Sequence, residues 1–256
     1  MNGTTERTTT DILSKVPELT LAFWIIKILA TTVGETGGDA VSMSMDLGYL
    51  VSTGIFAVIF VGAVLVQIRA PKFHPVIYWM TIVASTTVGT TLADFATRSL
   101  GIGYTGGSTI LLALLFGTLF IWKRVMGSVS IVDVSSPRSE FFYWLTITFS
   151  QTLGTALGDW TADTADMGYL GAAAVFGGLL ALVIAAYFWT KLSRTTLFWT
   201  AFILTRPLGA VVGDFLDKPV ANGGLALSRY TATAILGVMI IALVLLLPHR
   251  AARRSH

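Results

Sequence analysis

Four copies of one short pattern, Gly-x-x-x-Gly/Ala-Asp, recur along the chain, and this repetition constrains the fold more than any other feature. The pattern occupies residues 34–39, 89–94, 154–159 and 209–214. A Trp stands ten residues before the first Gly of every copy, at Trp24, Trp79, Trp144 and Trp199. Because several residue types keep one spacing together, the pattern indicates internal duplication, and we expect four structural repeats.

Composition places these repeats in a membrane. Of the 256 residues, 54% are hydrophobic and only 12% are charged, against roughly a quarter charged in a typical soluble domain. The mean hydropathy is +0.75. A soluble protein this apolar would have too little polar surface to face water, so the composition indicates an integral membrane protein.

The apolar residues fall into eight segments, two in each repeat. They cover residues 19–39, 47–68, 75–96, 105–122, 141–161, 167–189, 197–216 and 225–247. As a helix, each segment is long enough to cross a hydrocarbon core of roughly 30 Å. Lipid offers the backbone no hydrogen-bond partners, so helices are the expected solution. We therefore predict an all-α integral membrane protein with eight transmembrane helices.

Basic residues predict the orientation. Twelve of the seventeen Lys and Arg residues lie in the N-terminal arm, in the loops after the second, fourth and sixth segments, and in the C-terminal tail. The opposite face holds only Arg98, Lys218 and Arg229. The positive-inside rule then places both termini in the cytoplasm. Each repeat is a two-helix unit, so the four repeats enter the membrane in the same direction and are parallel.

Details around the pattern divide the chain into two homologous four-helix halves. Repeats 1 and 3 share an Asp-x-Gly-Tyr-Leu sequence at residues 46–50 and 166–170, whereas repeats 2 and 4 carry a cation nine residues after the first Gly, at Arg98 and Lys218. The expected organisation is an N-terminal cytoplasmic arm (1–18), a first half (19–124), a cytoplasmic linker (125–138), a second half (139–247) and a basic C-terminal tail (248–256).

The small residues of the pattern predict helix packing. Two small residues four positions apart lie on one helix face and allow close backbone approach in lipid. The expected packing residues are Gly34, Gly38, Gly89, Ala93, Gly154, Gly158, Gly209 and Gly213. The four Trp residues are expected to be anchors at the membrane interface.

The carboxylates that close each pattern predict a cation site. An ionised Asp near the centre of a membrane helix costs roughly 2.5–3.5 kcal/mol, so four of them must face the bundle interior, a water-filled cavity or each other. Such oxygen ligands suit hard cations, and the chain has no Cys and no His in its apolar segments for copper or zinc. The expected ligands are Asp39, Asp94, Asp159, Asp214 and Glu35. In the alternative interpretation, each Asp simply marks a helix end at the membrane surface. Further acidic residues, Asp46, Asp163, Asp166 and Asp217, are interpreted as solvated loop carboxylates, with guidance of cations to a pore mouth as the alternative role.

Glu35 and two buried cations inside the apolar segments suggest how transport is coupled to protons or counter-ions. Glu35 occurs only in repeat 1, which makes it the candidate for proton coupling. Lys27 and Arg206 are buried cations that need partners, either on their own helix, where Glu35 and Asp214 stand eight residues away, or on a neighbouring one. They serve either as counter-ions that a transported ion displaces or as charge neutralisers that stabilise the fold.

Three runs carry a resemblance to a known family: residues 27–35, Tyr143-Trp144 with residues 153–159, and residues 204–209. They resemble a bacterial integral-membrane family made of four copies of a short Gly-Asp repeat of unknown function. The resemblance covers residues 20–247, and repeat 2 departs from it only by having Ala93 in place of Gly. It implies a multi-pass protein of the bacterial inner membrane and implies no chemistry.

These observations together predict a membrane transporter, an exporter of a hard divalent cation such as Mn²⁺, coupled to protons through Glu35. Two alternatives remain: a proton-coupled carrier of a small organic or anionic solute held by Lys27 and Arg206, and a non-transporting membrane scaffold or sensor. The expected partners are the lipid bilayer and the transported metal ion or proton, with no nucleic acid and no cofactor; a homo-oligomer is compatible with the sequence. The chain lacks the Ser-His, His-Glu-x-x-His and Cys patterns of common enzymes, so no enzymatic activity is expected.

Overall fold

The computed structural model describes residues 14–253. Eight α-helices account for most of this part of the chain, which contains no strand. They are α1 (Leu21–Asp39), α2 (Gly48–Arg69), α3 (Pro75–Asp94), α4 (Gly103–Met126), α5 (Pro137–Asp159), α6 (Gly168–Trp189), α7 (Arg194–Asp217) and α8 (Arg229–Leu246). The all-α prediction with eight helices is confirmed. Six of the helices, all but α1 and α5, are long and apolar enough to cross a membrane.

Most boundaries follow the apolar segments, and the exceptions have local causes. α5 begins at Pro137, four residues before its apolar segment, because Ser136 and Ser139 form a capping box and Pro137 occupies the first turn. α1, α3 and α5 end at the Asp of the repeated pattern and continue as π-helical turns, Ala40–Ser44, Phe95–Ser99 and Trp160–Thr164. α7 instead continues to Asp217 and is followed by a 3-10 turn, Val220–Asn222.

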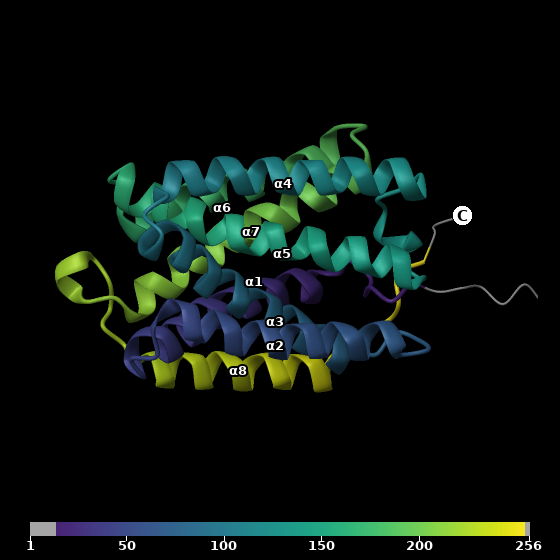
Figure 1. Cartoon of the computed structure of the whole chain (residues 1–256). Coiled ribbons are helices and arrows are strands. Elements are labelled where there is room, and N and C mark those ends of the chain that lie inside the picture. The colour runs from purple at the N-terminus through teal and green to yellow at the C-terminus, as the bar shows by residue number, and fades with distance from the viewer. Residues whose placement is uncertain (1–13, 254–256) are drawn as a thin grey trace, which may run out of the picture.

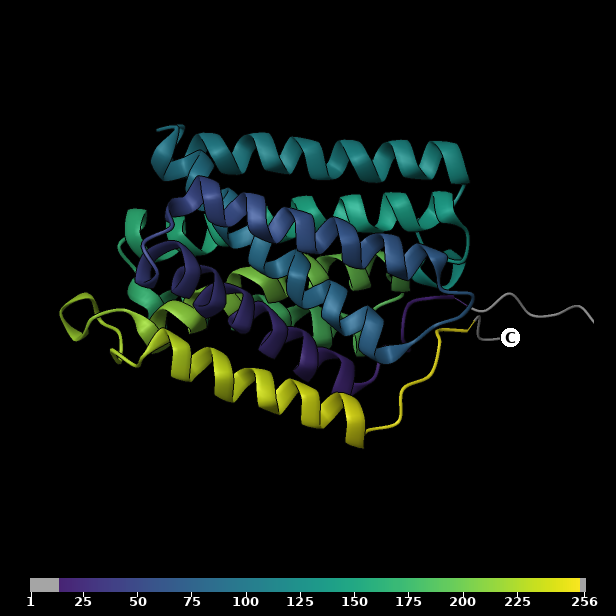
Figure 2. The same ribbon diagram turned by 60° about the horizontal axis from the view of Figure 1, so that its bottom comes forward.

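The odd-numbered helices form a closed inner ring, in which α1 contacts α3, α3 contacts α5, α5 contacts α7 and α7 contacts α1. The register of the contacts shows that neighbours run in the same direction. Thr86 and Thr90 of α3, for example, donate hydrogen bonds to the carbonyls of Ala30 and Gly34 on α1. Figures 1 and 2 show the bundle from two sides, with α4 and α8 at opposite edges.

The even-numbered helices form an outer layer that links consecutive repeats. Each packs mainly against the inner helix of the following repeat: α2 against α3, α4 against α5, α6 against α7 and α8 against α1. The inner helices bury most of their residues, whereas the outer helices expose apolar side chains such as Val58, Phe120 and Leu182. A single repeat therefore buries little surface alone, and the ring must close for every inner helix to be covered.

Glycines allow the inner helices to approach closely, in a pattern that follows the ring. The first Gly of each repeat lies against the residue three positions before the first Gly of the next repeat. The pairs are Gly34 with Thr86, Gly89 with Gln151, Gly154 with Arg206, and Gly209 with Thr31. At each of these glycines an added Cβ would overlap the neighbouring side chain. Small residues here are therefore a requirement of the ring geometry.

Aromatic side chains pack the N-terminal ends of the inner helices in the same cyclic order. We call them the aromatic belt, and its ring pairs are Phe23 with Trp79, Tyr78 with Trp144, Tyr143 with Trp199, and Phe198 with Trp24. The hydroxyls of Tyr78 and Tyr143 are 2.6 Å apart. The expectation that the Trp residues are interface anchors is wrong for Trp79, Trp144 and Trp199, which are at most 5% exposed and pack between helices.

The two ends of the described chain meet near the aromatic belt's end of the bundle. Pro17 forms an isolated antiparallel bridge with Ala251. Lys15 makes an ion pair of 2.7 Å with Glu140, close to the start of α5. The described part of the N-terminal arm, residues 14–18, is thus packed against the start of the second half and the C-terminal tail.

Candidate cation site

The four Asp residues of the repeated pattern lie at the C-terminal ends of the four inner helices, opposite the aromatic belt. Asp39, Asp94, Asp159 and Asp214 are 1%, 2%, 3% and 3% exposed. The alternative interpretation put them at a helix end on the membrane surface. They do end or nearly end their α-helices, but they are buried inside the protein, so their charges need partners within it.

Two cations bridge these carboxylates across the boundaries between repeats. Arg98 binds Asp94 of its own repeat and Asp159 of the next, with N–O distances of 3.0 Å in both cases. Lys218 binds Asp214 of its own repeat at 3.1 Å and Asp39 of the first repeat at 2.5 Å. The two arrangements occupy equivalent positions in the two halves. The sequence placed Arg98 and Lys218 at the membrane face with few basic residues and named no partners for them; in the structure their charged groups contact the carboxylates.

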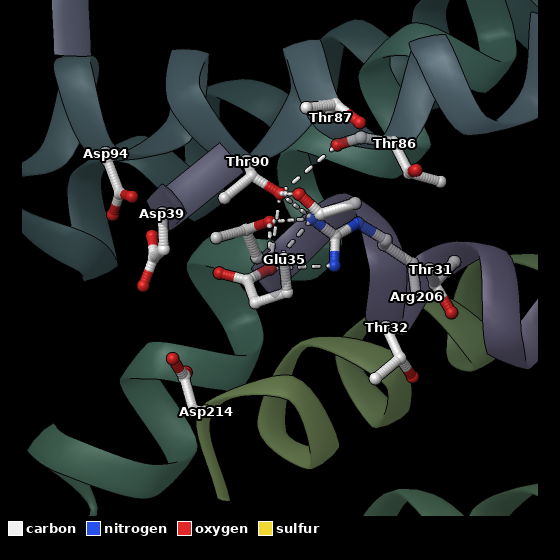
Figure 3. Close-up of polar contacts among 12 residues, drawn as sticks. Thr31, Thr32, Glu35, Asp39, Thr86, Thr87, Thr90, Asp94, Arg206 and Asp214 are labelled. Atoms are coloured by element: carbon white, nitrogen blue, oxygen red, sulfur yellow. Dashed lines mark hydrogen bonds and ion pairs between the residues drawn. The ribbon is translucent and has the colours of Figure 1, made fainter. Parts of the chain in front are cut away.

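A third ion pair lies deeper in the ring and involves Glu35. Arg206 donates from both terminal nitrogens to one oxygen of Glu35, at 3.0 Å each. It also donates to the hydroxyls of Thr90 and Thr155, at 2.6 and 2.5 Å. Figure 3 shows this cluster, with Asp39, Asp94 and Asp214 on the far side of Glu35 from Arg206. Of the two partners considered for Arg206, the structure selects a carboxylate on a neighbouring helix rather than Asp214 on its own.

Lys27 lies apart from these ion pairs, towards the aromatic belt. Its side chain is fully buried, and its Nζ lies 4.2 Å from the centre of the Phe202 ring with no hydrogen-bond partner. Ile82 and Ile147 occupy the equivalent positions of repeats 2 and 3 and are also fully buried. Lys27 does not pair with Glu35, so its amine is a buried polar group in an otherwise apolar layer.

Side chains at equivalent positions form layers along the ring axis. From the aromatic belt outwards, the layers are Lys27, Ile82, Ile147 and Phe202; then Thr31, Thr86, Gln151 and Arg206; then Glu35, Thr90, Thr155 and Ala210; and last the four Asp residues. Successive layers are four residues apart, roughly 6 Å along a helix. The layer next to the belt is thus mainly apolar, the two middle layers are mainly polar, and the last layer is entirely acidic.

Two groups of three carboxylates have the spacing of a metal site. Glu35, Asp159 and Asp214 form the inner triad, and Asp39, Asp214 and Asp217 form the outer triad. In each triad one oxygen from every residue lies within 4.8 Å of the others. Oxygen ligands stand about 2.0–2.6 Å from Mg²⁺ or Ca²⁺, so two oxygens on one ion are at most about 5 Å apart. Both triads fit that limit, and Asp94 belongs to neither.

The structure adds Asp217 to the candidate site, which corrects its interpretation as a solvated loop carboxylate. Asp217 is the last residue of α7, is buried, and binds Arg229 at 2.9 Å. Asp46, Asp163 and Asp166 are exposed, as expected. The sequence contained one signal for Asp217, its position three residues after Asp214, which places both on one helix face.

Lys218, one residue beyond α7, is held in its charged form by this site. Burial lowers the pKa of its amine, but the carboxylates of Asp214, Asp39 and Asp217 outweigh burial and raise the pKa above its ordinary value. The amine therefore serves as a permanent positive charge at the acidic end of the ring.

The apolar helices, the inner ring and the repeated site define a multi-pass membrane protein built from internal repeats. The chain belongs to the family described as Repeat of Unknown Function (DUF347), which matches it four times, over residues 22–73, 77–128, 142–193 and 197–253. Each match covers one inner helix and the outer helix that follows it. A search of curated proteins and a search of solved structures found no match.

Proposed function

We propose that this protein is a transporter, an exporter, of a hard divalent cation such as Mn²⁺, and that the inner triad is its central binding site. The observation that carries the proposal is the convergence of Glu35, Asp159 and Asp214. These three buried carboxylates come from three different repeats and place their oxygens within 4.8 Å of one another. Carboxylate oxygens at this spacing are the ligands that Mn²⁺, Mg²⁺ and Ca²⁺ prefer.

The charge balance of the ring favours a divalent ion. Six buried carboxylates gather at the acidic end: Glu35, Asp39, Asp94, Asp159, Asp214 and Asp217. Four cations contact them: Arg98, Arg206, Lys218 and Arg229. Lys27 is not counted because it contacts none of the six. The excess of two negative charges equals the charge of one divalent cation, and an excess without a counter-ion is costly at membrane depth.

The proposed topology has all eight helices crossing the bacterial inner membrane, with both termini in the cytoplasm. The distribution of basic residues supports it, and so does the contact between the two chain ends at residues 17 and 251. In this orientation the aromatic belt seals the cytoplasmic end of the ring, and the acidic layer lies towards the opposite side. Export requires the belt to open towards the cytoplasm and close again behind the ion.

Glu35 is the proposed site of proton coupling. It is the only carboxylate in its layer, and it is shared between Arg206 and the inner triad. Protonation would remove one ligand charge from the ion and weaken the pair with Arg206, which connects ion release to proton uptake. The carrier of an anionic solute has less support, because Arg206 already binds Glu35, Thr90 and Thr155.

The test is transport by the purified protein in liposomes that contain a Mn²⁺-sensitive dye. Asp159→Asn should abolish the Mn²⁺ flux, because Asn keeps the size of the side chain and loses the charge. Asp166→Asn is the matched control in the same repeat: Asp166 is exposed and has a positive φ of 55°, which Asn tolerates. If Asp159→Asn transports like the wild type and Mn²⁺ does not raise the melting temperature of either protein, the carboxylates serve the fold and the scaffold function replaces transport.

A further inference from the structure

We infer that the outer triad, Asp39, Asp214 and Asp217, is a second cation site at the mouth of the ring, and that the amine of Lys218 occupies it as a tethered plug. The inference rests on the proposed function and deepens it, since it assigns the step by which an ion reaches or leaves the central site. Lys218 would leave its position when a divalent ion takes its place.

The Lys218 amine bridges two carboxylates of the outer triad. Its Nζ lies 2.5 Å from Asp39 Oδ2 and 3.1 Å from Asp214 Oδ1, between carboxylates of the first and the last repeat. Oxygens of these two carboxylates and of Asp217 lie within 4.8 Å of one another, and Asp217 pairs with Arg229 rather than with Lys218. The ammonium group thus supplies a positive charge to two of the three carboxylates, Asp39 and Asp214.

An ammonium group leaves these ligands incompletely satisfied. Oδ1 of Asp39 and Oδ1 of Asp217 are buried and accept no hydrogen bond, although Asp39 is only 1% exposed. An ammonium group has three donors in a fixed tetrahedral arrangement, whereas a divalent ion accepts six or more oxygens, including both oxygens of one carboxylate. The unpartnered oxygens point to a ligand with more coordination positions than Lys218 provides.

The local charge also points to a divalent ion. The three carboxylates carry three negative charges, and Arg229, which binds Asp217 at 2.9 Å, supplies one positive charge. With Lys218 in place, one negative charge remains. A divalent ion in place of Lys218 makes the site neutral, whereas a monovalent ion makes no difference to the balance.

Two features of the fold fit Lys218 as a movable group and Asp214 as a shared ligand. Lys218 follows the last residue of α7 and leads into the loop between α7 and α8, which projects from the end of the bundle in Figures 1 and 2. Arg98, its counterpart in repeat 2, lies within a π-helical turn. Asp214 belongs to both triads, so an ion that moves between them keeps one ligand throughout.

The test counts the Mn²⁺ ions bound by the full-length protein in detergent, from the electron paramagnetic resonance signal of free Mn²⁺. Lys218→Gln removes the plug and keeps much of its length. This variant should bind one more ion per chain than the wild type, or bind the same number at least tenfold more tightly. Adding Asp217→Asn should abolish that gain. Arg98→Gln removes the equivalent bridging cation of repeat 2 and should give no increase in Mn²⁺ binding that depends on Asp217. Lys218→Arg should bind Mn²⁺ like the wild type.

The inference is overturned if Lys218→Gln binds no more Mn²⁺ than the wild type, or if its gain survives Asp217→Asn. If Lys218→Gln does not remain folded in Na⁺ alone, it is purified in Mn²⁺: recovery supports the site, and failure to recover contradicts it. The liposome assay keeps the two proposals apart. If Asp159→Asn has normal flux and Lys218→Gln shows an Asp217-dependent gain in Mn²⁺ binding, the central transport site is rejected and the outer site is supported. If Asp159→Asn loses flux and Lys218→Gln shows no gain in binding, the outer site is rejected and the central site is supported.

Discussion

Arg206 on α7 holds Glu35 on α1 by two hydrogen bonds of 3.0 Å to a single carboxylate oxygen. The pair joins the last repeat to the first, 171 residues apart, and both side chains are buried. This ion pair therefore joins α7 to α1 at the centre of the ring. At the same interface, Gly209 lies in close contact with Thr31.

Arg206→Gln should lower the free energy of unfolding by about 3–5 kcal/mol, because removing one partner leaves the charge of the other buried and unpaired. Combining it with Glu35→Gln should restore more than half of the loss, since the double variant leaves no unpaired charge. The measurement is thermal or denaturant unfolding in detergent, with Arg194→Gln, an exposed change on the same helix, as the control. Equal losses in the single and double variants would show that the pair does not stabilise the ring.

Gly209→Ala should destabilise the protein by about 1–3 kcal/mol, the range for overpacking a tight contact. An added Cβ at this position meets both the side chain and the backbone of Thr31. Gly54→Ala on the outer helix α2 is the control, because nothing lies within 4 Å of its added Cβ. There, the higher helix propensity of Ala should stabilise the protein by about 0.5–1 kcal/mol. The same unfolding measurement checks both variants, and we expect the free energy of unfolding to fall in Gly209→Ala and to rise in Gly54→Ala.

Lys27→Met should raise the free energy of unfolding by about 1 kcal/mol or more, because a buried polar group without a partner costs about 1–3 kcal/mol. Met keeps the length of the side chain and its contact with Phe202. Lys123→Met, at an exposed site on α4, should change stability little. The Mn²⁺ flux of Lys27→Met separates the two roles of this amine: a stable variant without flux identifies a coupling group, and a stable variant with normal flux shows that the amine is dispensable.

Reporter fusions in the loop at residues 191–194 and at the C-terminus should both give a cytoplasmic signal. The twelve-to-three distribution of basic residues between the two faces is the physical basis. A fusion after Asp46, in the turn between α1 and α2, should give the opposite signal and serves as the control. A periplasmic signal at either of the first two positions would contradict the proposed topology.

The sequence predicts well which helices form the inner ring, because the pattern that marks them spans only six residues of a single helix. The Gly-x-x-x-Gly/Ala-Asp pattern marks one face of each odd-numbered helix, and four parallel copies can bury that face only against one another. The outer positions of α2, α4, α6 and α8 follow from their apolar spans, which carry charged residues only in the first or last turns. Nothing in the spacing specifies, however, that each outer helix packs on the following repeat, because this depends on the direction in which the ring closes.

The partners of the ionisable residues were harder to predict for the same reason. The four-residue spacing of Asp94 and Arg98, and of Asp214 and Lys218, indicates pairs within a helix. Their second partners, Asp159 and Asp39, come from the neighbouring repeat. Those contacts, like that of Arg206 with Glu35, exist only once the order of the helices around the ring is known.

The last prediction concerns the aromatic belt, which in the proposed pathway must open towards the cytoplasm and close again. Tyr78→Phe should cost about 1–3 kcal/mol, because it leaves the buried hydroxyl of Tyr143 without its partner at 2.6 Å. Tyr78→Phe combined with Tyr143→Phe removes both hydroxyls and should recover most of that loss, since replacing both partners by apolar groups of the same shape is nearly neutral. Tyr187→Phe, at a half-exposed position on α6, should have little effect. Thermal unfolding of the wild type and the three variants measures these effects. A double variant that is less stable than Tyr78→Phe alone would show that each hydroxyl has a further role. If the belt is the cytoplasmic gate, the double variant should also change the Mn²⁺ flux in liposomes while leaving Mn²⁺ binding in detergent unaltered, because three layers of side chains separate the belt from the four Asp residues.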